Sequence, residues 1–153
     1  MTKITTRTAQ LEDLPLLYAY EQGIVGVERP FDPTLKPGHI NYYDIKEMIV
    51  SADTEVVVAV SGAQIIGSGY VKIKKGSDYV QYDTYGYIGF MYVEEAYRRM
   101  GVSHIILEAL QRWAKSRGVT ELRLGVYDDN LGAIAAYEKF GFKKHTIVMR
   151  LGD

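Results

Sequence analysis

The stretch Val93-Glu94-Glu95-Ala96-Tyr97-Arg98-Arg99-Met100-Gly101-Val102-Ser103 joins an aromatic, apolar run to a helical pattern. The run over 85–93 predicts a strand, and apolar residues then recur every three or four positions, as on one face of a helix: Val102, Ile105, Ile106, Ala109, Leu110 and Trp113. The first turn of a helix has unpaired N–H donors and about half a positive charge. Gly101 lets a ligand approach the backbone, and Arg98 and Arg99 can neutralise phosphate oxygens. The stretch therefore predicts a site for a phosphate or diphosphate.

A plainer interpretation of the same stretch is a strand-to-helix connection that needs glycine to turn, with solvated arginines. Two known phosphate loops are excluded. No Gly-Lys-Ser/Thr follows, so this is not a Walker loop, and a single glycine cannot form the three-glycine dinucleotide fingerprint.

Length and composition predict one globular domain over residues 1–153, with 47% hydrophobic and 24% charged residues. A net charge of −1 gives no general attraction to nucleic acid or to a membrane surface. With no cysteine, disulfides and thiolate metal sites are excluded. The histidines (His39, His104 and His145) lack metal-ligand spacing, so we expect no metal. Residues 1–7 contain no apolar signal region and no run reaches membrane-spanning length, so we expect a cytoplasmic protein.

Taken in order, the chain predicts β α α β β β α β α β. Strands are expected at 4–8, 55–60, 65–75, 79–93, 121–126 and 143–151, and helices at 12–22, from 41 or 42 to 51, after 102, and at 131–140. Gly23 and Gly26 are expected to end the first helix, and a Pro-rich irregular loop to fill 27–38. This order predicts an α/β (α+β) fold whose mixed, mostly antiparallel central sheet has helices on both faces.

A second pattern is Val126-x-x-x-Asn130-x-x-Ala133-x-x-x-Tyr137-x-x-x-Gly141. Asn130 is a good helix N-cap, and Tyr137 follows two helical turns later, so both can project along one face. The alternative is a capped amphipathic helix with Tyr137 in the core.

The first pattern, Arg98-x-x-Gly101-x-Ser103, resembles the pyrophosphate signature of the GNAT superfamily of acyl-CoA-dependent N-acetyltransferases. It departs from that signature at Ser103, where Gly or Ala is usual. The second pattern resembles another GNAT motif, and the predicted element order is that of the GNAT fold. The resemblance implies acetyl-CoA as co-substrate, with Asn130 on the pantetheine arm and Tyr137 beside the sulfur as general acid. It also implies cofactor contacts from two strand residues and from the loop: Met91, Val93, Arg98, Arg99, Met100, Gly101, Val102 and Ser103.

The resemblance does not identify the general base. The strand position that carries a glutamate in some GNAT members, eleven residues before Arg98, is Tyr87 here. Glu28 or a water chain could remove the amine proton, whereas Asp83 lies near the strand's start and Glu94 and Glu95 are expected to be solvated. Glu28, Arg29 and Tyr87 are expected to border the acceptor, and Arg29 would suit a substrate carboxylate. The alternative for Glu28 and Arg29 is an exposed loop pair.

These patterns predict an N-acetyltransferase that moves an acetyl group to the primary amine of a small molecule, such as an amino acid or a polyamine-like amine. One alternative is acetylation of protein N-termini or lysines. Another is a non-catalytic acyl-CoA-binding sensor, which the tyrosine at position 87 favours and Tyr137 disfavours. Since GNAT members often dimerise, a homodimer is also expected.

Overall fold

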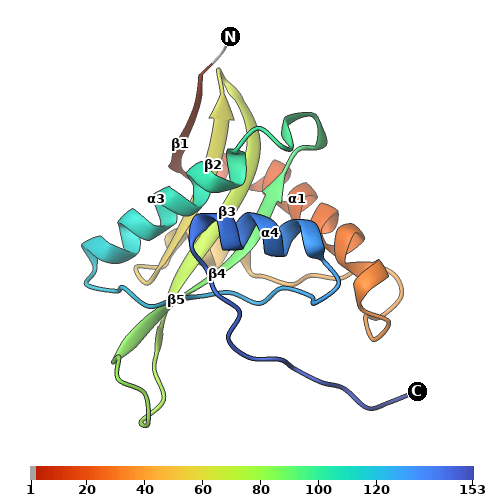
Figure 1. Ribbon diagram of the computed structural model, residues 1–153. Coiled ribbons are helices and arrows are strands. Elements are labelled where there is room, and N and C mark those ends of the chain that lie inside the picture. Colours follow the sequence, from red (N-terminus) through yellow and green to blue (C-terminus); the bar gives the residue numbers. More distant parts are fainter. Residues whose placement is uncertain (1–2) are drawn as a thin grey trace.

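The computed structural model describes residues 3–153, which form a five-stranded sheet with helices on both faces (Figure 1). The strands lie in chain order; the first three neighbouring pairs are antiparallel and the last pair is parallel. The elements are β1 (Ile4–Thr8), α1 (Leu14–Glu28), α2 (Ile45–Val50), β2 (Thr54–Ser61), β3 (Gln64–Lys75), β4 (Thr84–Val93), α3 (Val102–Ser116), β5 (Leu122–Arg123) and α4 (Leu131–Phe140). The predicted mixed, mostly antiparallel sheet is confirmed.

Each face of the sheet has its own hydrophobic core. Alternate residues of a strand point to opposite faces, so Val56 of β2 packs with α1 and α2 whereas Val57 packs with α3. The first core also holds Leu17, Tyr20, Ile45 and Phe90, and the second holds Ile66, Ile88, Ile106 and Leu110. Helix α4 crosses in front of the sheet in Figure 1, and its Tyr137 and Phe140 pack against the second core.

Helix α1 is longer than the sequence predicts, because it continues through Gly23 and Gly26 to Glu28. A glycine inside a helix costs about 1 kcal/mol relative to alanine. Gly23 is needed for packing, since a Cβ there would lie 2.6 Å from the Tyr92 ring of β4. Close contact between helix and sheet therefore outweighs the poor helix propensity, and Glu28 becomes a helical residue instead of a loop residue.

Helix α2 starts later than predicted, at Ile45. The buried carboxylate of Glu21 accepts hydrogen bonds from the backbone N–H groups of Tyr42 (2.7 Å) and Tyr43 (2.8 Å), which holds both residues outside the helix. Asp44 then caps the helix by accepting from Glu47 N.

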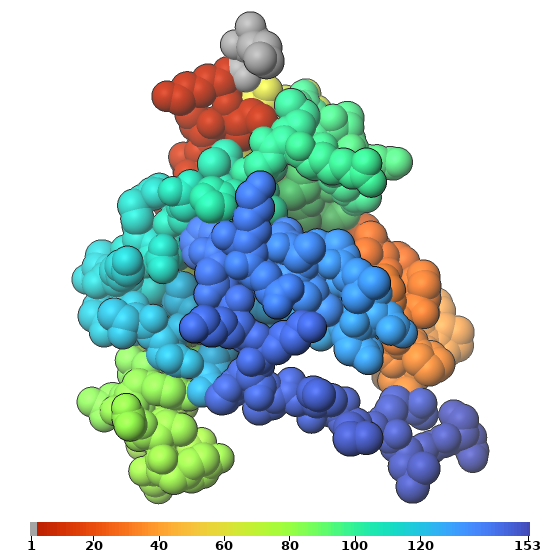
Figure 2. Space-filling view, in the orientation of Figure 1, coloured from red at the N-terminus to blue at the C-terminus, as the bar shows by residue number. Residues whose placement is uncertain are grey.

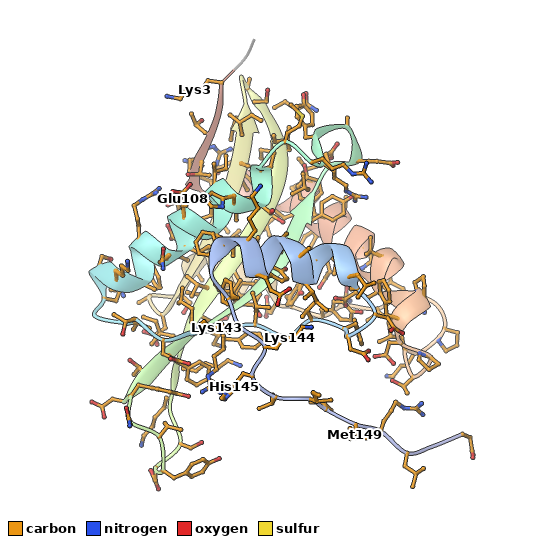
Figure 3. All side chains as sticks on the ribbon, in the orientation of Figure 1. Lys3, Glu108, Lys143, Lys144, His145 and Met149 are labelled. Carbon is orange, nitrogen blue, oxygen red and sulfur yellow. The ribbon has the colours of Figure 1, made fainter. Side chains whose placement is uncertain are left out.

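Strand β4 begins at Thr84 instead of position 79, after a turn, and β5 has only two residues of the expected 121–126. The strand predicted at 143–151 is absent. Residues 143–153 form an exposed segment, which extends from the body of the protein in the space-filling view of Figure 2. Its Ile147, Val148 and Leu151 are each more than four-fifths exposed. The labels of Lys143, Lys144, His145 and Met149 show its course in Figure 3. A strand needs a partner edge, and the two-residue β5 offers almost none. Helix α4 occupies the predicted residues. Within 3–153 no helix is both long and apolar enough to span a membrane.

Candidate active site

The turn between β4 and α3 forms an open helix N-terminus. Gly101 is the N-cap of α3 at φ 79°, and no atom lies within 4 Å of where its Cβ would be. No side chain caps this end of the helix, and its first turn holds no acidic residue. Arg99 also adopts a left-handed conformation (φ 65°), which is unfavourable for a side chain outside turns and functional sites. The free N–H donors and the empty space above Gly101 suit an anion.

The other residues of the turn differ in what they can offer a ligand. The Nε of Arg98 donates to the Val93 carbonyl (2.9 Å), and its guanidinium lies over the Tyr92 ring, so this side chain braces the turn. Arg99 and Met100 are exposed, and Ser103 is half-buried. Val102 is buried in the core, which leaves only its backbone for a ligand.

Strand β4 has a free edge leading to this turn. Strand β5 pairs with β4 only at Gly86 and Tyr87, so over 88–93 this edge pairs with no strand of the described residues. On its other edge β4 pairs with β3, and the register of this pairing shifts between Ser68 and Tyr70, which marks a β-bulge. Phe90 of β4 takes a φ of 57° there. This bulge turns the strand locally. Met91 and Val93 lie half-buried on the free stretch, where an extended ligand could pair as an added strand.

Helix α4 begins with the predicted cap. The Oδ1 of Asn130 accepts from Ala133 N (3.3 Å), which uses one of the amide's polar atoms. Two turns on, Tyr137 is half-buried with its ring against Phe142. Burial raises the pKa of Tyr137 to about 12, and the negative charge of Glu28 and the Tyr87 phenol add to the shift. The phenol is therefore protonated at neutral pH, as a proton donor must be.

Glu28 ends α1 and lies half-buried near Tyr137, although the two residues are far apart in sequence. Burial raises the pKa of its carboxyl, a nearby Tyr42 phenol opposes this shift, and the charge of Asp32 adds to it. A carboxylate with a raised pKa is a better proton acceptor than an ordinary glutamate. The structure thus brings together Glu28, Tyr87 and Tyr137, three of the residues that the sequence singles out.

Arg29, which the sequence suggests for a substrate carboxylate, makes its contacts within its own loop. Its guanidinium donates to the carbonyls of Lys36 (2.8 Å) and Gly38, so it holds together the loop that follows α1. Both terminal nitrogens therefore have partners within the chain, and the contact favours a loop-shaping role over recognition of a substrate carboxylate.

Three residues that sequence reasoning did not single out complete this region: Asp32, Tyr42 and Tyr127. The Tyr127 hydroxyl donates to Asp32 Oδ2 (2.5 Å), and its ring stacks on Phe31 at 6.1 Å. These contacts join the loop after α1 to the loop before α4. Burial raises the pKa of Tyr42 to about 12, with Glu28 contributing. Their one sequence signal is the abundance of tyrosine, thirteen in the chain.

The remaining candidates lie elsewhere. Asp83 is exposed, away from the site. Glu94 and Glu95 lie in the turn between β4 and α3, where Glu95 is exposed and Glu94 lies beside Tyr20. His39 contacts Asn41 and His104 contacts Glu108, whereas His145 is exposed. Within residues 3–153 no group of three potential metal ligands converges.

Comparison with known proteins gives a family match. The model of the acetyltransferase (GNAT) family matches residues 22–142. A curated relative, the uncharacterized N-acetyltransferase YobR of Bacillus subtilis (strain 168), is 35% identical over 60 residues. That match covers 39% of this chain and only 24% of the relative.

Solved structures share the fold. A predicted acetyltransferase of Clostridium acetobutylicum, solved with acetyl-CoA, has a TM-score of 0.74 and 21% identity, covering 98% of this chain and 96% of that one. An aminoglycoside antibiotic 6'-N-acetyltransferase of Acinetobacter haemolyticus has a TM-score of 0.74 and 17% identity, covering 97% of each chain. At these identities the likeness establishes the architecture and leaves the acceptor open.

Proposed function

Because the chain belongs to the acetyltransferase (GNAT) family, we propose that it transfers an acetyl group from acetyl-CoA to the primary amine of a small molecule. The observation that carries the proposal is the free edge of β4 over 88–93. At one end it leads to the uncapped N-terminus of α3, and at the other it follows Tyr87, beside Tyr137 and Glu28. This arrangement supports a proposed anion site at one end of the strand edge, a proposed acid–base pair at the other, and amide binding between them.

The residues divide the binding of acetyl-CoA between them. The N–H groups at the start of α3, with Arg99, would hold the diphosphate, while Arg98 keeps the turn in shape. The backbone of Met91 and Val93 and the amide of Asn130 would bind the pantetheine arm. The bound acetyl-CoA supplies the acetyl group as a reactive thioester.

The acid–base residues would handle two protons. Glu28, directly or through water, would accept a proton from the acceptor ammonium, since only a neutral amine can attack the thioester carbonyl. As the C–S bond breaks, Tyr137 would donate its phenolic proton to the departing thiolate, and the proton that the nitrogen loses on becoming an amide would restore the phenol through water. Neither task needs a metal ion.

The test is release of free CoA in the presence of amines, with Tyr137→Phe as the main variant. Loss of the phenol should lower kcat by roughly 10²–10⁴, the usual worth of a positioned general acid, and leave the affinity for acetyl-CoA within a few-fold. Tyr79→Phe is the matched control, because Tyr79 is 89% exposed on the turn before β4.

Wild-type turnover in Tyr137→Phe would remove Tyr137 from the mechanism. A fall in thermal stability with unchanged kcat would return this tyrosine to a purely packing role. If the wild-type protein binds acetyl-CoA but releases no CoA with any amine, amino acid or peptide, the chain acts as a sensor and the proposal is wrong.

A further inference from the structure

The exposed segment 143–153, here called the arm, has the sequence pattern of a half-buried strand but pairs with no strand of the described residues. Ile147, Met149 and Leu151 fall on one face of an extended chain, because alternate residues of a strand point to opposite faces. All three side chains are more than four-fifths exposed. Within residues 3–153, no backbone N–H or C=O group of the arm bonds to another backbone group. An exposed apolar face of this kind marks an interaction site.

The sheet ends in an edge that is also unpaired. Strand β5 is last in the sheet order and pairs with β4 on one side, so its outer edge pairs with no strand of the described residues. Leu122 and Leu124 are only partly buried against the second core, and Val126, the next residue in this alternation, is exposed. The unpaired N–H and C=O groups of a sheet edge are a template for an added strand. The chain therefore carries both an unpaired strand and an unpaired edge.

The core beside this edge is incompletely covered. Helix α4 packs against the same second core as β5, through Tyr137 and Phe140. None of the ten residues of α4 is buried, however, and Leu131 in its first turn is 72% exposed. A helix on the surface of a globular domain normally buries an apolar stripe. A strand added at the outer edge of β5 would bring further apolar side chains to this core.

The joint between α4 and the arm directs the arm away from its own sheet. The backbone N of Phe142 donates to the Tyr137 carbonyl (3.0 Å), and the Phe142 ring lies 5.9 Å from both the Tyr137 and the Phe140 rings. These contacts fix the point at which the arm leaves α4. From there the arm leads away from the sheet to the end marked C in Figure 1, and it stands out from the body in Figure 2. The arm is thus presented to another molecule.

One antiparallel register between the arm and residues 121–128 matches both apolarity and charge. It places two apolar pairs and two pairs of opposite charge across from each other: Leu122 with Met149, Leu124 with Ile147, Glu121 with Arg150, and Asp128 with Lys143. The bond from Arg123 to Glu121 uses one carboxylate oxygen, which leaves the other for Arg150. Moving the arm by two residues would instead set Arg150 across from Arg123, and like charges directly opposite each other are destabilising.

We propose that two copies of this chain exchange their arms, each arm adding as an antiparallel strand to the outer edge of β5 in the other copy. The same chain carries the arm and the matching edge, so a two-fold pair satisfies both copies at once and leaves no free arm. The outer edge of β5 faces away from β4, so the added strand leaves the free edge of β4 over 88–93 open. The exchange goes beyond the proposed function and does not depend on acetyl transfer.

Cysteine cross-linking tests the exchange directly, because the chain contains no cysteine. The register sets Arg123 across from Val148, and a disulfide needs Cα atoms within about 7 Å. Arg123→Cys and Val148→Cys chains, co-expressed with different tags and then oxidised, should give a disulfide-linked pair that carries both tags. Val50→Cys is the matched control for Val148→Cys, because Val50 is also an exposed valine (66%) but lies at the end of α2. Its mixture with Arg123→Cys should give no linked pair.

Two results of the cross-linking would overturn the inference. One is the absence of a linked pair between the Arg123→Cys and Val148→Cys chains. The other comes from a chain that carries both substitutions. If this chain forms an internal disulfide and remains a monomer, the arm folds onto its own edge, whereas exchanged arms should give a covalent dimer.

Sedimentation equilibrium tests the exchange without cysteines. The wild-type protein should be a dimer, and Met149→Asp should raise its dissociation constant at least about ten-fold, because the exchange would bury the added carboxylate. Met149 is exposed in the single chain, so the variant should keep the circular dichroism spectrum of the wild-type protein. Val50→Asp is the control and should leave the dissociation constant unchanged. A monomeric wild-type protein, or a dimer that Met149→Asp does not weaken, would overturn the inference.

Discussion

Replacing Gly101 by glutamate tests the anion site at the start of α3. The added Cβ meets no atom within 4 Å, and the residue is exposed, so the substitution itself creates no clash at the Cβ. The cost to folding comes from the backbone, because a residue with a Cβ at φ 79° loses about 1–2 kcal/mol in the left-handed region. A carboxylate at a helix N-terminus recovers about 0.3–1 kcal/mol of that cost. The variant should therefore fold, slightly less stable than the wild-type protein.

The same helix provides a matched control at its other end. Gly118 has a φ of 76°, and a Cβ there also meets no atom within 4 Å. Gly118→Glu therefore has the same backbone cost, but its charge lies at the negative end of the helix dipole, where it is unfavourable. Gly118→Glu should be the less stable of the two variants, by roughly 0.5–2 kcal/mol from the two opposed dipole terms.

Affinity for acetyl-CoA should follow the opposite order. Gly101→Glu places a negative charge where the diphosphate would bind, so calorimetry should show affinity falling at least about a hundred-fold, while Gly118→Glu binds as the wild-type protein does. Chemical denaturation of both variants supplies the stability comparison. Unchanged affinity in Gly101→Glu, or equal losses in both variants, would refute the assignment of this turn as the anion site.

Two further predictions concern Glu28 and Asn130. Burial raises the pKa of Glu28, and the kcat/KM of the wild-type enzyme should fall as the pH drops through that pKa, because the protonated carboxyl cannot accept the amine proton. The Glu28→Gln variant should lose this pH dependence. Its activity should fall most at pH values where the acceptor amine is mostly charged. An equal loss at every pH would indicate that Glu28 binds substrate and is not the base. Asn130→Ala should cost about 1 kcal/mol of stability in denaturant titration by removing the cap on Ala133 N, whereas Asn130→Ser should retain most of it. Equal stability of the two variants would exclude the cap.

Elements set by local chemistry were predicted well from the sequence. Helix α4 lies between an asparagine that caps its first turn and Gly141, whose φ of 127° ends it, and both signals lie within the segment itself. The predicted end of helix α1 was wrong because Gly23 packs against Tyr92, which lies sixty-nine residues away in the chain. The predicted strand at 143–151 failed for a related reason, since β-branched residues alone cannot supply the hydrogen-bonding partner that a strand needs.

The candidate site likewise contains features that local sequence determines and features that depend on contacts between distant residues. The turn before α3 and the cap of α4 are short patterns, so the sequence predicted their positions. The loop next to Glu28 is instead held by the hydrogen bond between Tyr127 and Asp32, which are 95 residues apart. No spacing rule could pair them, and no local feature showed that Arg29 would bind the carbonyls of its own loop.

This division has a consequence for specificity. The proposed diphosphate turn and the helix that carries Tyr137 depend on local sequence, so we expect substitutions elsewhere to leave acetyl-CoA binding unchanged. The proposed acceptor side lies where the loop after α1 meets the loop before α4, and few main-chain hydrogen bonds constrain either loop. We expect substitutions at Asp32 or Tyr127 to change the charge beside Glu28 without displacing Tyr137, the proposed general acid. If the proposed general acid lies on a helix and the acceptor contacts lie on two loops, the loops can change with the acceptor while the helix stays the same.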